Sequence, residues 1–109
     1  MKNINKKVKI KKDNFGYLIN YLDWNESIAK QIAREENILL NSNHWEIIYF
    51  IRNFYIEFNI VPPLRILSQS LKKKIKRKIN SCDLFNLFPK NPILQSSKIA
   101  GIPKPNQCI

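Results

Sequence analysis

The sequence has few glycines and cysteines and a single histidine, and these shortages exclude two kinds of site. With 2 glycines among 109 residues, it has no glycine-rich loop of the kind that cradles nucleotide phosphates. The 2 cysteines and 1 histidine form no cluster with carboxylates at metal-site spacing. We therefore expect neither a nucleotide cofactor nor a metal ion.

Long apolar stretches are also lacking. The N-terminus is charged, but no apolar segment of the kind found in signal peptides follows it. No apolar run approaches the length that crosses a membrane. These patterns predict a cytoplasmic protein without a membrane partner, and two cysteines in that reducing compartment predict thiols, not a structural disulfide.

Acidic residues are scarce compared with basic ones. The chain has 19 Lys and Arg against 8 Asp and Glu, a formal net charge of +11. Twelve of the cations lie in two runs, Lys2, Lys6, Lys7, Lys9, Lys11 and Lys12, and Lys72, Lys73, Lys74, Lys76, Arg77 and Lys78. These runs indicate direct contact with an anionic partner such as RNA. The alternative is solvated lysines in a chain that is rich in lysine throughout.

The length suits one domain with one modest core, which we place at residues 1–100. Apolar residues alternating with lysines, followed by the turn-forming residues 13–16, predict a β-hairpin over about residues 4–19. Capping patterns at Asp23 and Asn43, helical periodicity and prolines predict helices over about residues 23–37, 43–58, 63 into the second lysine run, 81–88 and 92–99. The predicted fold is mainly α, a small orthogonal helical bundle preceded by the hairpin.

Residues 101–109 are expected to form a flexible C-terminal arm. Gly101 is a helix stop, and Pro103 and Pro105 each fix φ near about −65° and lack an amide donor. Fully drawn out, such an arm reaches at most about 30 Å, and Cys108 lies one residue from its end. A thiol in that position suits a group that travels to partners, although an incidental terminal cysteine is the alternative.

Three residues in the helical part have candidate roles. His44 lies in the first turn of the central helix, where a capping or surface role competes with a catalytic one. Arg52 lies on the same mainly apolar helix, so it is either partly buried and paired or reaches to water. Cys82 stands at a helix start, but beside Leu84 and Phe85 it is better interpreted as a small packed residue.

Several segments in this order and spacing resemble the DsrC/TusE family. They are His44-Trp45, Phe50-Ile51-Arg52-Asn53-Phe54-Tyr55, Pro63-Leu64-Arg65-Ile66-Leu67, Leu87-Phe88-Pro89-Lys90-Asn91-Pro92 and Lys98-Ile99-Ala100-Gly101-Ile102-Pro103-Lys104-Pro105, with Cys108 penultimate. The resemblance covers essentially the whole chain and implies a helical bundle preceded by a β-hairpin. In the DsrC branch a second cysteine lies eleven residues before the penultimate one, where this chain has Ser97. The chain is therefore similar to the one-cysteine TusE branch.

The resemblance implies a persulfide sulfur carrier of a sulfur relay. Cys108 would accept sulfane sulfur from an upstream TusBCD-type complex and deliver it to the tRNA 2-thiouridylase, for 2-thiolation of the wobble uridine in tRNA. Lys104 is the nearest cation on the arm and favours the thiolate, whereas the terminal carboxylate disfavours it. We hypothesise that Arg52 or Arg65 lines a groove where the arm docks and offsets that carboxylate. Structural pairing of these arginines with Glu46, Glu57 or Asp83 is the alternative.

Two other functions remain open at this stage. The first is a DsrC-like partner of dissimilatory sulfite reductase, which the serine at position 97 disfavours. The second is a small basic nucleic-acid-binding regulator that uses the Pro62-Pro63 corner as a helix-turn-helix. It predicts steeply salt-dependent nucleic-acid binding that survives Cys108→Ser.

Overall fold

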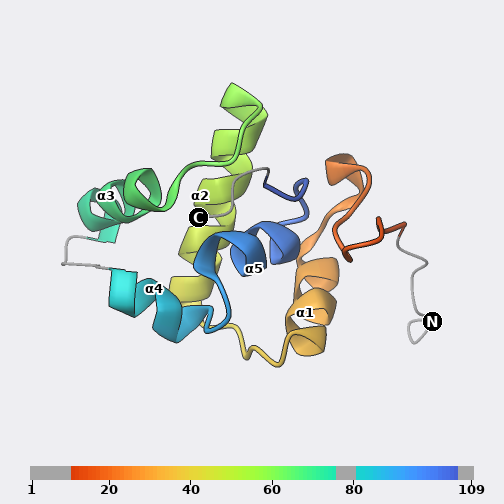
Figure 1. Cartoon of the computed structure of the whole chain (residues 1–109), viewed down its shortest axis with the longest axis horizontal. Helices are drawn as coiled ribbons and strands as arrows, with labels where there is room; N and C mark the ends of the chain where they lie inside the picture. The colour runs from red at the N-terminus through yellow and green to blue at the C-terminus, as the bar shows by residue number, and fades with distance from the viewer. Residues whose placement is uncertain (1–10, 76–80, 106–109) are drawn as a thin grey trace.

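The computed structural model describes residues 11–75 and 81–105 of the chain, and the described part is mainly helical. A short 3-10 helix, η1, comes first, and five α-helices follow it (Figure 1). Their bounds are η1 Tyr21–Asp23, α1 Glu26–Glu35, α2 Ser42–Phe58, α3 Leu64–Ile75, α4 Ser81–Leu87 and α5 Pro92–Ile99. The mainly helical class predicted from the sequence fits this arrangement.

Helix α5 lies at the centre of the molecule and contacts α1, α2 and α4 (Figure 1). Helix α3 packs on α2 and α4 from the other side. The shared core includes fully buried side chains from all five helices and from the end of the chain, among them Ile32, Ile48, Leu67, Leu84, Phe88, Ile99 and Ile102. No helix in the described ranges is long and apolar enough to cross a membrane.

The predicted β-hairpin over residues 4–19 is wrong, because the described part of the chain contains no strand. Residues 12 and 18 form a single antiparallel bridge, and residues 4–10 lie outside the described ranges. The Asp13 carboxylate accepts hydrogen bonds from the amides of Phe15 and Tyr17, which folds the chain into a tight turn. Tyr17 and Leu18 are both buried although they are consecutive. A strand alternates its side chains between two faces, so this burial does not match a strand.

Two helices begin at residues other than the predicted caps. Asn25, not Asp23, caps α1, since its side chain accepts the amide of Ile28 at 2.9 Å. Asp23 instead ends η1. Asn41 caps α2 two residues before the predicted Asn43, with its Oδ1 accepting from two amides of the first turn. Asparagine is a favoured cap, and each segment contains more than one, with Asn20 and Asn25 before α1 and Asn37, Asn41 and Asn43 near the start of α2.

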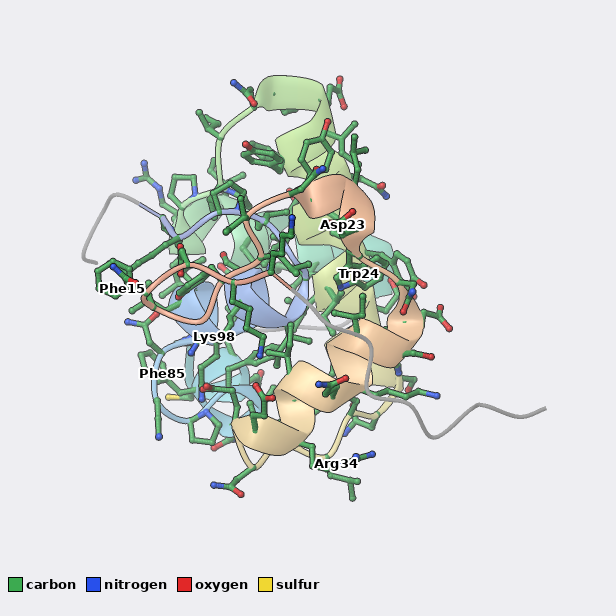
Figure 2. All side chains as sticks on the ribbon, turned by 90° about the vertical axis from the view of Figure 1, so that its right-hand side faces the viewer. Phe15, Asp23, Trp24, Arg34, Phe85 and Lys98 are labelled. Atoms are coloured by element: carbon green, nitrogen blue, oxygen red, sulfur yellow. The ribbon has the colours of Figure 1, made fainter. Side chains whose placement is uncertain are left out.

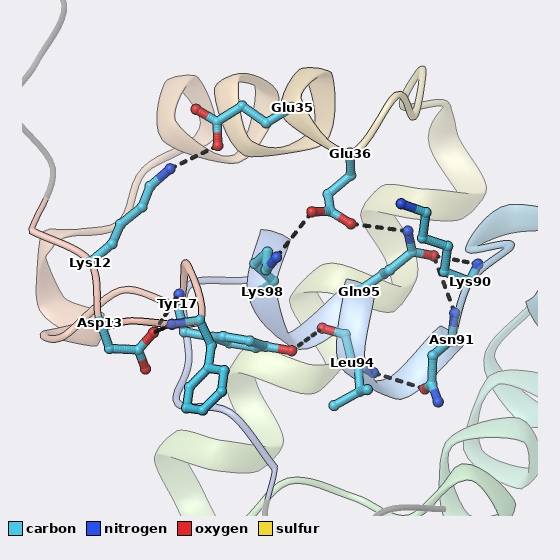
Figure 3. A network of polar contacts seen from close by, with 11 residues as sticks. Lys12, Asp13, Tyr17, Glu35, Glu36, Lys90, Asn91, Leu94, Gln95 and Lys98 are labelled. Carbon is cyan, nitrogen blue, oxygen red and sulfur yellow. Dashed lines mark hydrogen bonds and ion pairs between the residues drawn. The ribbon is translucent and has the colours of Figure 1, made fainter.

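A polar network fastens α5 to the end of α1 (Figure 3). The Glu36 carboxylate, which follows α1, accepts from Lys98 Nζ at 3.0 Å and from Gln95 Nε2 at 3.1 Å. Burial raises the pKa of Glu36, but these two hydrogen bonds, together with the charges of Lys98 and Lys90, outweigh it and lower the pKa below its ordinary value. The Tyr17 hydroxyl donates to the Leu94 carbonyl at 2.9 Å, so the N-terminal turn is tied to the same helix.

Candidate functional site

The described part of the C-terminal arm, residues 101–105, leaves the end of α5 in a defined direction. Cys108 itself lies outside the described residues. Gly101 adopts φ +74° directly after the helix, and the Ile102 amide donates to the Ser97 carbonyl at 3.2 Å. The Ile102 side chain is fully buried in the core. The chain is therefore packed into the body at the point where the arm begins.

A groove of about 400 Å³ runs beside residues 103–105. Its other wall is formed by the end of α2 and the turn that leads into α3. The lining from these elements includes Tyr55, Asn59, Val61, Pro62 and Leu64, with Ile93 from α5. The arm thus starts along a mainly apolar channel at the surface.

Lys104 stands exposed on the arm. Its Nζ lies 4.7 Å from the centre of the Phe15 ring, a cation–π contact with the N-terminal turn. Phe15 is itself 62% exposed. The predicted arm cation therefore lies at the surface beside an exposed aromatic ring.

Arg52 faces the base of the arm. Its Nη1 donates to the carbonyls of Ala100 at 2.9 Å and Tyr21 at 3.3 Å, and its guanidinium lies 4.2 Å from the centre of the Trp24 ring. Burial lowers the pKa of Arg52, while the charges of Tyr49 and Tyr21 oppose the shift. The structure gives Arg52 two carbonyl partners and an aromatic face, and its predicted offset of the terminal carboxylate stays a prediction.

Arg65 lies apart from this site. It is exposed in the first turn of α3, and its carbonyl accepts a hydrogen bond from Ser68 Oγ at 3.3 Å. It does not line the groove beside the arm. Its predicted role toward Cys108 likewise stays a prediction.

His44 is a buried capping residue. Its Nδ1 accepts the Asn41 amide at 3.0 Å, which completes the capping box of α2. Because Nδ1 accepts, Nε2 carries the proton and donates to the Leu87 carbonyl at 2.8 Å. The ring also stacks edge-to-face on Phe88. These contacts support the capping role over the catalytic one and tie the start of α2 to the end of α4.

The pH dependence of stability should reveal the His44 contacts. Burial lowers the pKa of His44, although the bond to the Leu87 carbonyl opposes the shift. The unfolded chain then binds more protons than the folded chain, so the free energy of unfolding falls as the pH drops below about 6.5. Urea unfolding of the wild type and His44→Gln at pH 7.5 and 5.5 measures this. We expect the wild type to lose more stability between the two pH values than the variant, and equal losses would contradict it.

Ser97 and Cys82 differ in burial. Ser97, at the second-cysteine position of the DsrC branch, is fully buried, and its hydroxyl has no hydrogen-bond partner among the described residues. Cys82 is exposed, so its expected role as a packed residue is wrong. It lies in the first turn of α4, where it points away from the core while Leu84 is buried.

The lysine runs are only partly described. Lys11 is exposed, and Lys12 forms an ion pair of 2.8 Å with Glu35. Lys72 and Lys73 are exposed on α3. The remaining lysines of the first run and residues 76–78 lie outside the described ranges. Within those ranges no group of His, Cys, Asp and Glu is arranged to hold a metal ion.

Trp24 and Gly101 form one contact region with Arg52 that the sequence does not predict. The Trp24 Nε1 donates to the Ile99 carbonyl at 2.8 Å, and a Cβ on residue 101 would lie 2.3 Å from Trp24 Cδ1. Figure 2 shows Trp24 beside η1, at the end of α1 opposite Arg34. The partners lie 75 residues apart in the chain, and no local pattern around Trp24 signals the contact.

Comparison with known proteins places this arrangement in one family. The family described as DsrC like protein matches residues 4–109. Sulfurtransferase TusE of Buchnera aphidicola subsp. Acyrthosiphon pisum is 54% identical over 92% of this chain and 89% of its own length. Sulfurtransferase TusE of Photorhabdus laumondii is 50% identical over 92% of this chain and 91% of its own.

Solved structures show the same fold. The NMR structure of Allochromatium vinosum DsrC is 40% identical, with a TM-score of 0.83 over 92% of this chain and 90% of that one. The crystal structure of the oxidized gamma-subunit of the dissimilatory sulfite reductase (DsrC) from Archaeoglobus fulgidus is 31% identical, with a TM-score of 0.85 over 94% of both chains. The similarity in sequence and in fold therefore covers nearly the whole chain.

Proposed function

Because this chain belongs to the DsrC-like family and is a sulfurtransferase of a sulfur relay, we propose that Cys108 is the residue that carries the sulfur, as a persulfide. The observation that carries this proposal is that Cys108 follows the Pro103-Lys104-Pro105 segment inside residues 4–109, the range that matches the DsrC like protein family. Its arm departs from a base packed into the helical body, in a chain 54% identical to a sulfurtransferase TusE. A thiol on an arm whose first residues are packed into the body is suited to transferring sulfur repeatedly from one partner to another.

Each transfer exchanges one sulfur–sulfur bond for another. The Cys108 thiolate attacks the terminal sulfur of a donor persulfide, the donor's S–S bond breaks, and the donor cysteine leaves as a thiolate. Cys108 now bears the sulfane sulfur, and no external oxidant or reductant is required. The next acceptor takes the sulfur onward and restores the Cys108 thiolate. Lys104 is the cation nearest to Cys108 along the chain, and a neighbouring cation favours the anionic form of a thiol.

The proposed partners are an upstream TusBCD-type complex as donor and the tRNA 2-thiouridylase with bound tRNA as acceptor. The product is 2-thiouridine at the wobble position of tRNA. Serine at position 97 supports this assignment over a partner of dissimilatory sulfite reductase, because a serine hydroxyl cannot form a disulfide with Cys108. The exposed lysines 72 and 73 on α3 favour approach to the tRNA phosphates.

A reconstituted relay tests the proposal. The donor complex, the thiouridylase, tRNA and a cysteine desulfurase are combined with and without this chain, and 2-thiouridine is quantified by mass spectrometry of the nucleosides. We expect thiolation to depend on the chain at catalytic amounts. A chain that leaves thiolation unchanged, yet binds RNA with a steep salt dependence, would reject the carrier in favour of a nucleic-acid-binding regulator.

A further inference from the structure

The last carbonyls of α5 are held by two donors from distant parts of the chain. Trp24 Nε1 donates to the Ile99 carbonyl at 2.8 Å, and Arg52 Nη1 donates to the Ala100 carbonyl at 2.9 Å. Carbonyls at a helix C-terminus have no partner within the helix. The two donors satisfy them from outside, one from the segment before α1 and one from α2.

The two donors are also fixed to each other. The Arg52 guanidinium stacks on the Trp24 ring at 4.2 Å, and the same Arg52 nitrogen reaches the Tyr21 carbonyl at 3.3 Å. Trp24 packs edge-to-face on Tyr49, with ring centres 5.8 Å apart. Each side chain thus limits the rotamers of the other, and the pair holds the end of α5 as one unit.

The contact continues into the first residue of the arm. A Cβ on residue 101 would lie 2.3 Å from Trp24 Cδ1 and 2.8 Å from Leu18 Cδ1, so the backbone passes directly against the indole. Gly101 there turns the chain with φ +74°. A Schellman cap accounts only for the amides of Gly101 and Ile102, which donate to the carbonyls of Lys98 and Ser97. Here the contact surrounds residues 99–101, where the helix becomes the arm.

We propose that Trp24 and Arg52 are positioning residues that, with Gly101, fix the direction in which the arm leaves the body. We call these three residues the arm anchor. The inference rests on the proposed function in one respect, namely that the arm presents Cys108 to a partner. Seven residue-to-residue steps lead from position 101 to position 108 and span at most about 25 Å, so a swing of about 20° at the base displaces the tip by roughly 9 Å. A fixed base confines the region that the thiol searches and raises its effective concentration at a docked partner.

Spin-label distances test the anchor without any sulfur chemistry. Labels are placed at Glu46→Cys on α2 and Lys104→Cys on the arm, in a Cys82→Ser, Cys108→Ser background, since both labelled positions are exposed. We expect one narrow distance distribution in this parent, and about a twofold greater width in Arg52→Ala. Trp24→Phe, which keeps an aromatic ring against Gly101 but removes the indole donor, should give an intermediate width. Arg34→Ala, an exposed arginine at the far end of α1, is the matched control and should leave the width unchanged.

Sulfur transfer provides the second readout. In otherwise wild-type chains, Arg52→Ala should lower kcat/KM for transfer from a persulfidated donor protein by about tenfold. Alkylation of Cys108 by iodoacetamide requires no particular arm direction, so the anchor predicts a wild-type rate in Arg52→Ala, whereas an offset of the terminal carboxylate by Arg52 predicts a slower one. Circular dichroism and melting temperature confirm that each variant is folded under the assay conditions.

The outcomes separate the anchor from the carrier. If the distance distribution kept its parent width in both Arg52→Ala and Trp24→Phe, the arm anchor would be overturned. A wider distance distribution with an unchanged kcat/KM for sulfur transfer would also overturn it. An equal loss of alkylation and transfer would overturn it as well, since Arg52 would then act on thiol reactivity. If the wild-type chain accepts no sulfur, the proposed function fails while the distance measurement still decides whether the base is held.

Discussion

Replacing Cys108 with serine is expected to reduce 2-thiouridine formation in the reconstituted relay to the level found without the chain. A serine oxygen cannot hold sulfane sulfur as a persulfide, so no sulfur passes from donor to acceptor. Residues at a chain end contribute little to stability. The free energy of unfolding should therefore stay within about 0.5 kcal/mol of the wild type. Nucleoside mass spectrometry and urea unfolding measure the two effects.

Cys82→Ser is the matched control for this loss. It makes the same chemical change at the exposed cysteine in the first turn of α4, on a helix that does not carry the arm. We expect wild-type thiolation from this variant. Full thiolation by Cys108→Ser, or a loss in Cys82→Ser equal to that in Cys108→Ser, would move the sulfur-bearing role away from the arm.

Gly101→Ala is expected to be strongly destabilising. A residue with a side chain at φ +74° carries a backbone cost of about 1–2 kcal/mol. Its Cβ would also overlap Trp24 Cδ1 at 2.3 Å and Leu18 Cδ1 at 2.8 Å, and forced overpacking typically costs about 1–3 kcal/mol. Together these give a loss of about 2–5 kcal/mol. For a domain of this size that lowers the melting temperature by about 10 °C or more.

Gly16→Ala separates the two contributions. Gly16 also has a positive φ, +87°, but a Cβ there would meet only the end of the Lys98 side chain, at 3.4 Å from Nζ. This variant should therefore show the backbone cost alone, about 1–2 kcal/mol. Urea unfolding measures the loss in the free energy of unfolding for each variant. Equal losses for Gly101→Ala and Gly16→Ala would show that the close approach to Trp24 does not add to the cost of a side chain at position 101.

Helix positions follow from the sequence more closely than their caps do. Helical periodicity and proline placement correctly predict that α2 ends at Phe58 and that α5 runs from Pro92 to Ile99. The caps are displaced by two residues because several asparagines compete locally, and tertiary contacts decide among them. The hairpin prediction failed for a related reason. The Asp13 side chain closes a turn, and burial of two consecutive residues then replaces the alternation that a strand needs.

The sequence reveals the proposed sulfur-bearing cysteine more readily than it reveals the arm anchor. The proposed sulfur-bearing residue, Cys108, stands out in the sequence because a thiol after a proline-containing segment is a local feature. The arm anchor does not, because Trp24 and Ile99 are 75 residues apart and become neighbours only when α5 packs between α1 and α2. The position of Arg52 on a mainly apolar helix marks it as a candidate in the sequence. The sequence does not reveal its carbonyl partners, which depend on the same packing.

The most direct test of the account is intact-protein mass spectrometry of the chain after incubation with a cysteine desulfurase, cysteine and the upstream donor proteins. The account predicts an added mass of about one sulfur atom that is lost in Cys108→Ser and kept in Cys82→Ser. The adduct should disappear on addition of a reductant, as a persulfide does. A wild-type chain that stays unmodified, while the same donor loads another acceptor, would contradict the claim that Cys108 carries sulfur.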